Sequence, residues 1–144
     1  MASTNLTQAR NNSCKKQNSY FSTLIDVTDS SVGLVSTNLL LANLPPNAII
    51  TDAYLHRVTV SDAATSATFK LGTTEGGAEV MAAADIKAAT GKVGSLVGQI
   101  LTNSGKPLYG TLTITGAQTA GKFYVVVEYL EPTKMTGELT KVTR

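Results

Sequence analysis

The chain has 144 residues, of which 42% are hydrophobic and 15% are charged, and its formal net charge is +2. This length suits one domain that is large enough to bury a core. Because no run of about 18 apolar residues occurs and the first residues lack an apolar stretch, we expect neither a membrane span nor a secretory signal. The single cysteine, Cys14, cannot form an internal disulfide.

Charge is unevenly distributed along the chain. Residues 1–23 carry three basic residues and no acid (+3), residues 24–132 carry six basic and nine acidic residues (−3), and residues 133–144 carry three basic residues and one acid (+2). We predict an extended or disordered arm over residues 1–19, a β-sandwich domain over 20–132 and a basic tail over 133–144. Basic ends favour an acidic protein surface or nucleic acid, and simple solvation explains them equally well.

The N-terminal half predicts several strands separated by turns. The signal is an alternation of apolar and polar residues, bounded by Gly, Pro, Asp and Ser. Strands are expected over residues 20–27, 48–60 and 67–71, and turns over residues 26–33, 61–65 and 73–78. The apolar run 34–44 suits a helix or a strand equally. Within the long strand, Ile50 is expected on the face opposite to Ala53 and Leu55.

Residues 79–90 form the one predicted helix. This stretch contains five alanines, which favour helix, and Gly91 is placed to end it. Since alanines bury little surface, the helix should be short and peripheral. A further strand is expected over residues 93–101, followed by a turn over 103–105.

Residues 108–130 contain two alternating runs that predict a β-hairpin, joined by the small polar loop 116–121. The second run is apolar on both faces, so we place it centrally in a sheet, covered on both sides or beside a partner subunit. Pro132 ends this strand. Largely buried side chains are expected at Leu112, Ile114, Val125 and Val127.

Seven or eight short strands with frequent turns and little helix predict an all-β fold. The pattern favours an antiparallel β-sandwich of the jelly-roll type with an extended N-terminal arm. The sequence contains no internal repeat and no second domain.

The loop before the last strand matches the G-x-x-x-x-G-K spacing of a phosphate-binding loop, at residues 116–122. That loop needs a following Ser or Thr to bind Mg²⁺ and a helix whose N-terminus binds the anion. Phe123 stands at the metal-ligand position, and a strand is predicted in place of the helix. We therefore interpret the motif as a hairpin tip and not as a nucleotide site.

Residues suited to catalysis or metal binding are few. His56 is the only histidine and falls within a predicted strand, and the single cysteine lies in the arm without a scaffold for a base beside it. The carboxylate pairs Asp26/Asp29 and Glu75/Glu79 lie in or beside predicted turns. We predict no catalytic, cofactor-binding or metal-binding residue. Direct nucleic-acid binding is not expected either, because acids accompany the aromatic residues of the last strand.

Three stretches follow one another in a recognisable order: Leu44 with Pro46, Asn47, Ala48, Ile50, Asp52 and Ala53, then Lys70 to Thr73, then Val125 to Tyr129. In this order they resemble the capsid decoration, or cement, proteins of tailed bacteriophages, which have jelly-roll folds. The resemblance covers about residues 40–132. It implies a structural protein without catalysis, made in the bacterial host cytoplasm, which sits on the outer capsid surface and clamps neighbouring major capsid proteins.

The arm and the last strand supply the expected contacts. From their charge and position, Arg10, Lys15 and Lys16, with Tyr20 and Phe21 after them, are the candidate capsid-contact residues. The apolar second face of the last strand predicts a symmetric homo-oligomer, either dimer or trimer. The alternatives are a head-fibre or tail component and a carbohydrate-binding sandwich, which would require exposed aromatic platforms.

Overall fold

The computed structural model describes residues 17–29, 32, 36–98, 100–102 and 104–131. These residues form nine strands and no helix. The strands are β1 (Gln17–Asp26), β2 (Thr37–Leu44), β3 (Ala48–Thr59), β4 (Ser66–Gly72), β5 (Met81–Asp85), β6 (Gly91–Val93), β7 (Ile100–Thr102), β8 (Lys106–Thr115) and β9 (Lys122–Glu131). The strands expected over residues 20–27, 48–60 and 67–71 correspond to β1, β3 and β4, and the ambiguous run 34–44 contains the strand β2.

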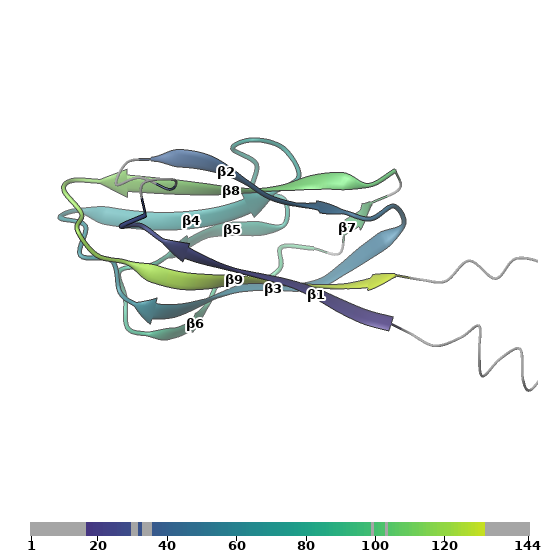
Figure 1. The fold of residues 1–144 in the computed structure, drawn as a ribbon, viewed down its shortest axis with the longest axis horizontal. Coiled ribbons are helices and arrows are strands. Elements are labelled where there is room, and N and C mark those ends of the chain that lie inside the picture. Colours follow the sequence, from purple (N-terminus) through teal and green to yellow (C-terminus); the bar gives the residue numbers. More distant parts are fainter. Residues whose placement is uncertain (1–16, 30–31, 33–35, 99, 103, 132–144) are drawn as a thin grey trace, which may run out of the picture.

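The strands form two antiparallel sheets that stack face to face (Figure 1). Sheet A has the order β1-β9-β3-β6, with β7 also paired to β3, and sheet B has the order β2-β8-β4-β5. Among the described strands, only β4 and β5 are consecutive in the chain and also paired with each other. This connectivity, in which the chain repeatedly crosses between two sheets, is that of a jelly roll. The predicted all-β antiparallel sandwich is therefore confirmed.

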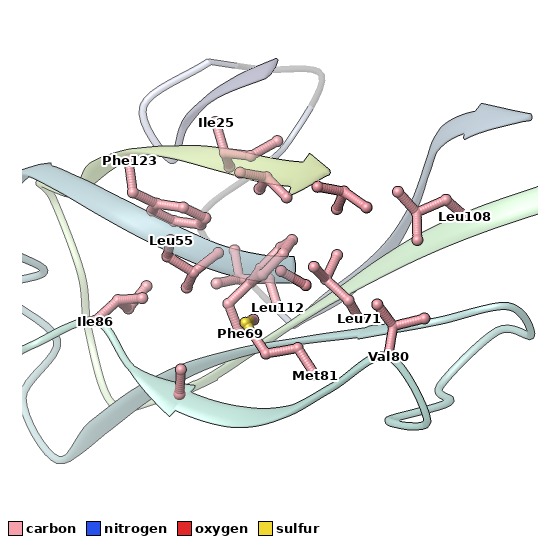
Figure 2. Close-up of a cluster of buried hydrophobic side chains, with 14 of the residues drawn as sticks. Ile25, Leu55, Phe69, Leu71, Val80, Met81, Ile86, Leu108, Leu112 and Phe123 are labelled. Carbon is pink, nitrogen blue, oxygen red and sulfur yellow. The ribbon is translucent and has the colours of Figure 1, made fainter. Parts of the chain in front are cut away.

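The core lies between the two sheets, where inward-facing side chains interdigitate (Figure 2). Phe69 of β4 and Phe123 of β9 meet edge to face across the layer, with their ring centroids 5.0 Å apart. Gly110 of β8 leaves room for this ring, because a Cβ at Gly110 would lie 2.3 Å from Cζ of Phe69. Of the four residues expected to be largely buried, Leu112, Val125 and Val127 are fully buried and Ile114 is half-buried.

The predicted hairpin over residues 108–130 is wrong. β8 belongs to sheet B and β9 to sheet A, so the two strands do not pair. The loop 116–121 instead crosses between the sheets, beside the loop 60–65 that crosses from β3 to β4. Ala117 accepts a hydrogen bond from the backbone N–H of Ala64 at 2.9 Å, which joins the two crossings. Stacked sheets lie about 10 Å apart, a span that six residues reach easily. The central position predicted for the last strand is confirmed, since β9 lies between β1 and β3.

The predicted helix over residues 79–90 is also wrong. β5 occupies part of this stretch as an outer strand of sheet B, with Met81 opposite Leu71 and Ala84 opposite Phe69 of β4. A register shift between those two pairs places buried residues three positions apart. That spacing mimics a helix, but it arises from a β-bulge. Tertiary pairing along β4 has overridden the helix propensity of alanine.

Two further expectations are corrected in sheet A. The strand expected over residues 93–101 is divided into the short strands β6 and β7, because Gly94 turns the chain with a φ of 81°. In β3, Ile50 is buried together with Ala53 and Leu55 and does not face the other way. A register shift between Ile50 and Asp52 reverses the alternation at that point.

Candidate interaction surface

The loop that matches the phosphate-binding spacing is occupied by contacts within the fold. β9 begins at Lys122, so a strand follows the motif, as predicted. Nζ of Lys122 lies 2.8 Å from Oδ2 of Asp26, at the end of β1. Hydrogen bonds lower the pKa of the Asp26 carboxyl to about 2, and the bond from Lys122 has a larger effect than either bond from Thr28. The same contact raises the pKa of Lys122. The lysine that would meet a phosphate is thus paired with a carboxylate.

Asp62, in the neighbouring crossing loop, holds the rest of this segment. Its carboxylate accepts hydrogen bonds from the hydroxyl of Thr119 and from the backbone N–H groups of Thr119 and Ala120, the latter two at 2.8 Å. These bonds, with the Thr119 hydroxyl first, lower the pKa of Asp62 to about 2. Backbone N–H groups of the loop therefore point to a carboxylate of the protein itself.

One small hollow lies beside the crossing loops, at the end of β1 and the start of β9. This hollow of about 180 Å³ is lined by Asp26, Thr28, Thr59, Ala120, Gly121 and Lys122, and it is smaller than the usual ligand pocket of about 300–1,000 Å³. His56 is exposed on β3, on the outer face of sheet A. In the described part of the chain, no group of three or more His, Cys, Asp or Glu side chains is placed to hold a metal ion. Glu79 is engaged by Thr73, whose N–H and hydroxyl both donate to Oε1 at 2.7 Å.

The outer faces of the two sheets differ in character. Sheet B presents threonines in neighbouring registers, at positions Thr68, Thr111, Thr113 and Thr115. The outer face of sheet A carries a group of aromatic and aliphatic side chains, which we call the aromatic face and which consists of Tyr20, Leu24, Tyr54, Tyr124 and Val126. Asp52, His56 and Glu128 lie on the same side of the sheet, with Glu128 opposite Tyr20. The register places Leu24 beside Tyr124 and Val126 beside Tyr54. Tyr20, Leu24 and Tyr124 are exposed on this face, whereas Tyr54 and Val126 are half-buried.

The aromatic face is partly engaged at one end only. Nζ of Lys92, on β6, lies 4.0 Å from the centroid of the Tyr54 ring and 3.4 Å from Oδ2 of Asp52. A cation over a ring face is attracted by the ring quadrupole. At the other end, Tyr20 is 73% exposed and Leu24 is 42% exposed, both on the outer strand β1.

The predicted contact residues fall into two groups. Arg10, Lys15 and Lys16 lie outside the described residues, as do Cys14 and most of the predicted arm. Tyr20 points outward from β1, whereas Phe21 is half-buried and packs against the core. The structure therefore does not bring Tyr20 and Phe21 onto one surface.

Sequence reasoning missed Leu24, Tyr54 and Tyr124 as companions of Tyr20. Leu24 lies at an even position of β1, as does Tyr20, so the alternation of this strand could have found it. Tyr54 and Tyr124 join the face only through the pairing of β1 with β9 and of β9 with β3, which no local pattern reveals.

The first and last described residues of the sandwich lie side by side. Gln17 at the start of β1 is paired with Glu131 at the end of β9. The start of β1 and the end of β9 therefore lie next to each other at the same end of the sandwich (Figure 1). Pro132 itself lies outside the described residues, and β9 ends immediately before it.

No protein-family model matches the chain, and no curated protein matches it. Solved structures do. A chain in the acid-stable capsid structure of Helicobacter pylori bacteriophage KHP30 has a TM-score of 0.55 and 17% identity, over 81% of this chain and 94% of that chain. A chain in the capsid asymmetric unit of cyanophage Pam1 has a TM-score of 0.58 and 19% identity, over 82% of this chain and 86% of that chain. The described residues contain no helix long and apolar enough to cross a membrane. At these identities the likeness establishes a shared fold: this chain has the sandwich of two chains found in phage capsid structures.

Proposed function

We propose that the chain is a structural protein of a phage virion, which decorates the outer capsid surface and clamps neighbouring major capsid proteins without catalysis. The observation that carries the proposal is the fold shared with chains of two phage capsid structures. Each alignment covers more of the neighbour than of this chain, so the neighbours are also small sandwich chains. A decorating protein needs one interface with the lattice, which a single small sandwich can supply.

The surface chemistry fits an adhesive role better than a catalytic one. The charged groups of the small hollow are paired with each other, through Lys122 and Asp26. The single histidine, His56, is exposed on an open sheet face. By contrast, the aromatic face offers exposed apolar and aromatic surface area of the kind that protein–protein interfaces use.

We further propose that the N-terminal arm anchors the protein through Arg10, Lys15 and Lys16, with Tyr20 at its base. The arm carries +3 and the tail +2, against −3 for residues 24–132. Because Gln17 is paired with Glu131, both basic segments are attached at one end of the sandwich. That end is suited to an acidic surface of the major capsid protein. A segment that orders on binding gains little affinity per area but can reach across subunits.

The test is occupancy on capsids that lack this chain, measured at low and high salt. The variants are the full chain, a chain without residues 1–16, and a full-length chain with Arg10, Lys15 and Lys16 all changed to Gln. Since β1 begins at Gln17, this deletion spares the strand, and the Gln variant separates charge from length. We expect occupancy of the full chain to fall with salt, because the Debye length shrinks from about 8 Å at 0.15 M to about 3 Å at 1 M. Both variants should lose most of this dependence.

Two outcomes separate the claims. If the truncated chain decorates as well as the full chain at low salt, the arm is not the anchor and the sandwich carries the contact. The decoration role is refuted if two results are found together. The folded full chain binds no capsid at any salt concentration, and purified particles do not contain the chain in a copy number set by the capsid lattice. A head-fibre or tail component would then be found in particles at a low copy number.

A carbohydrate-binding module is the second candidate, favoured by the tyrosines of the aromatic face. Tyr20 and Tyr124 are both exposed there, as sugar platforms require. The ring of Tyr54 is less available, because Lys92 lies over it. Glycan-array binding that is lost in Tyr124→Ala and kept in Thr113→Ala, a change on the outer face of sheet B, would support this candidate.

A further inference from the structure

Within residues 17–29, 32, 36–98, 100–102 and 104–131, the outer strand β1 is a long edge without the usual protection. Natural sheets guard their edges with charges, proline, bulges or very short strands. β1 is ten residues long and pairs with β9 in one continuous register without a bulge. Its residues 17–25 include no charged residue, proline or glycine. The other outer strands are guarded: β2 and β5 have register shifts against their partner strands, and β6 and β7 have only three residues each.

The register identifies which backbone groups of β1 face outward. The N–H of Val27 donates to the carbonyl of Gly121 at 3.0 Å, in line with the register of β1 against β9. In an antiparallel pair the hydrogen-bonded positions alternate, so odd-numbered residues of β1 bond to β9. The N–H and C=O groups of Tyr20, Ser22 and Leu24 therefore point away from β9, towards the side of β1 on which no described strand pairs. These are also the residues whose side chains lie on the outer face.

We propose that β1 pairs with β1 of a second copy of this chain, antiparallel, about a two-fold axis at Ser22. Each Tyr20 then lies opposite Leu24 of the partner subunit, which joins the two exposed apolar side chains of the strand. Aromatic and aliphatic cross-strand pairs of this kind are stabilising. The only charge of β1, Asp26, falls opposite an uncharged position, residue 18, so no like charges meet. Sheet A becomes continuous across the dimer, and the two aromatic faces join into one.

Self-complementarity is what selects a second copy as the occupant. A shift of the register by one residue would set the outward backbone groups out of phase. An axis at Phe21 would place Tyr20 opposite a serine and leave Leu24 without an apolar neighbour. Only the axis at Ser22 satisfies both the bonding phase and the apolar pairs. This pairing specifies the homo-oligomer expected from the sequence and needs no capsid partner, so it can fail while the decoration role stands, and the reverse.

The first experiment measures association of the full-length protein by sedimentation across micromolar concentrations. We expect the wild type to dimerise, and Ser22→Lys and Ser22→Asp each to weaken dimerisation roughly tenfold or more, because each places like charges opposite one another at the axis. An equimolar mixture of the two variants should associate again, since opposite charges then meet. Thr113→Lys, an exposed change on the outer face of sheet B, is the matched control and should dimerise as the wild type does. The thermal midpoint of each variant checks that it is folded.

A cross-link tests the register independently, in a Cys14→Ser background. Paired Cα atoms at a hydrogen-bonded position lie about 5.5 Å apart, within disulfide range. Ser22→Cys should therefore form a disulfide dimer on mild oxidation. Tyr20→Cys should not, because its two copies would lie four positions apart, about 13 Å at roughly 3.3 Å per residue. A monomeric wild type at every concentration, Ser22→Lys that dimerises normally, a mixture that stays monomeric, or equal cross-linking at both positions would overturn the proposal.

Discussion

Truncation of consecutive residues in β8 provides a direct test of how the sandwich is packed. Leu112 is fully buried between the sheets, Thr113 is exposed on the outer face of sheet B, and Ile114 is half-buried at the end of the strand. Changing a well-packed Leu to Ala removes transfer free energy and leaves a cavity, at a cost of about 2–5 kcal/mol. The Leu112 side chain lies in the middle of the core layer, as Figure 2 shows. The surrounding side chains therefore have little freedom to move into the cavity that its truncation would leave. We expect Leu112→Ala to fall in the upper half of this range.

The two neighbours set the scale. Thr113→Ala should change the free energy of unfolding by less than about 0.5 kcal/mol, as surface substitutions usually do. Ile114→Ala should lie between the two, because only part of its side chain leaves water on folding. Urea denaturation gives all three values, provided that the slope m stays constant across the series. Equal losses at Leu112 and Thr113 would refute the inward and outward assignment of β8. A larger loss at Ile114 than at Leu112 would place the centre of the core elsewhere along the strand.

Three further outcomes follow from the packing and the loops. Gly110→Ala should destabilise the fold by about 1–3 kcal/mol through overpacking, because the new Cβ would lie 2.3 Å from Cζ of Phe69. Gly98→Ala is the control in the same denaturation assay. It should be nearly neutral, because a Cβ at Gly98 meets nothing within 4 Å. The pKa of Asp62 is lowered from 3.8 to about 2, so the stability it contributes is present above about pH 4 and is lost as the pH falls towards 2. Asp62→Asn should therefore flatten the fall of Tm between pH 4 and pH 2, and unchanged slopes would contradict this. Since Lys122 is held by a carboxylate, ATP with Mg²⁺ should leave Tm unchanged; a saturable rise that Lys122→Ala abolishes would reveal a nucleotide site.

The elements that could be predicted from the sequence are those with a strong local period. In β4, Ala67, Phe69 and Leu71 are buried and alternate with partly exposed residues, and this alternation is visible in the sequence itself. The same holds for β1, where Ile25 is buried and Leu24 is exposed. A period of two needs no knowledge of the partner strand, because the pleat alone sets it.

Partner choice was not predictable, because it is decided by contacts distant in sequence. The loop 116–121 has the composition of a hairpin turn, yet it crosses between sheets. What fixes the crossing is the placement of Leu112 and Phe123 on opposite walls of one core, together with the carboxylate of Asp62 from another crossing loop. Neither contact produces a pattern in the sequence of the loop itself. The bulges in β3 and β5 failed to be predicted for the same reason, since an extra residue in one strand is defined only against its partner.

The candidate surface was predictable only in part. Tyr20 could be singled out by its position after a basic segment, but its neighbours on the aromatic face come from β3 and β9, more than 30 and 100 residues away in the chain. Phe21 carried an equal signal in the sequence and faces the core instead. An aromatic pair in a strand always divides between two faces, so the sequence could identify the pair without identifying which member is exposed.

The proposed dimerisation through β1 and the proposed anchoring by the arm are coupled by geometry. Antiparallel pairing about Ser22 sends the two arms, each attached at Gln17, away from each other at opposite ends of the joined strands. One dimer would then reach two separate lattice sites, and the second contact would gain from a high effective concentration. Ser22→Lys should accordingly lower capsid occupancy at limiting protein concentration while reaching the same occupancy at saturation, because each arm keeps its own affinity. The measurement is a binding isotherm on capsids for the wild type and for Ser22→Lys at one salt concentration, with Thr113→Lys as the control. Superimposable isotherms for the wild type and Ser22→Lys would show that each chain binds the lattice independently. Dimerisation through β1 would then make no contribution to anchoring by the arm.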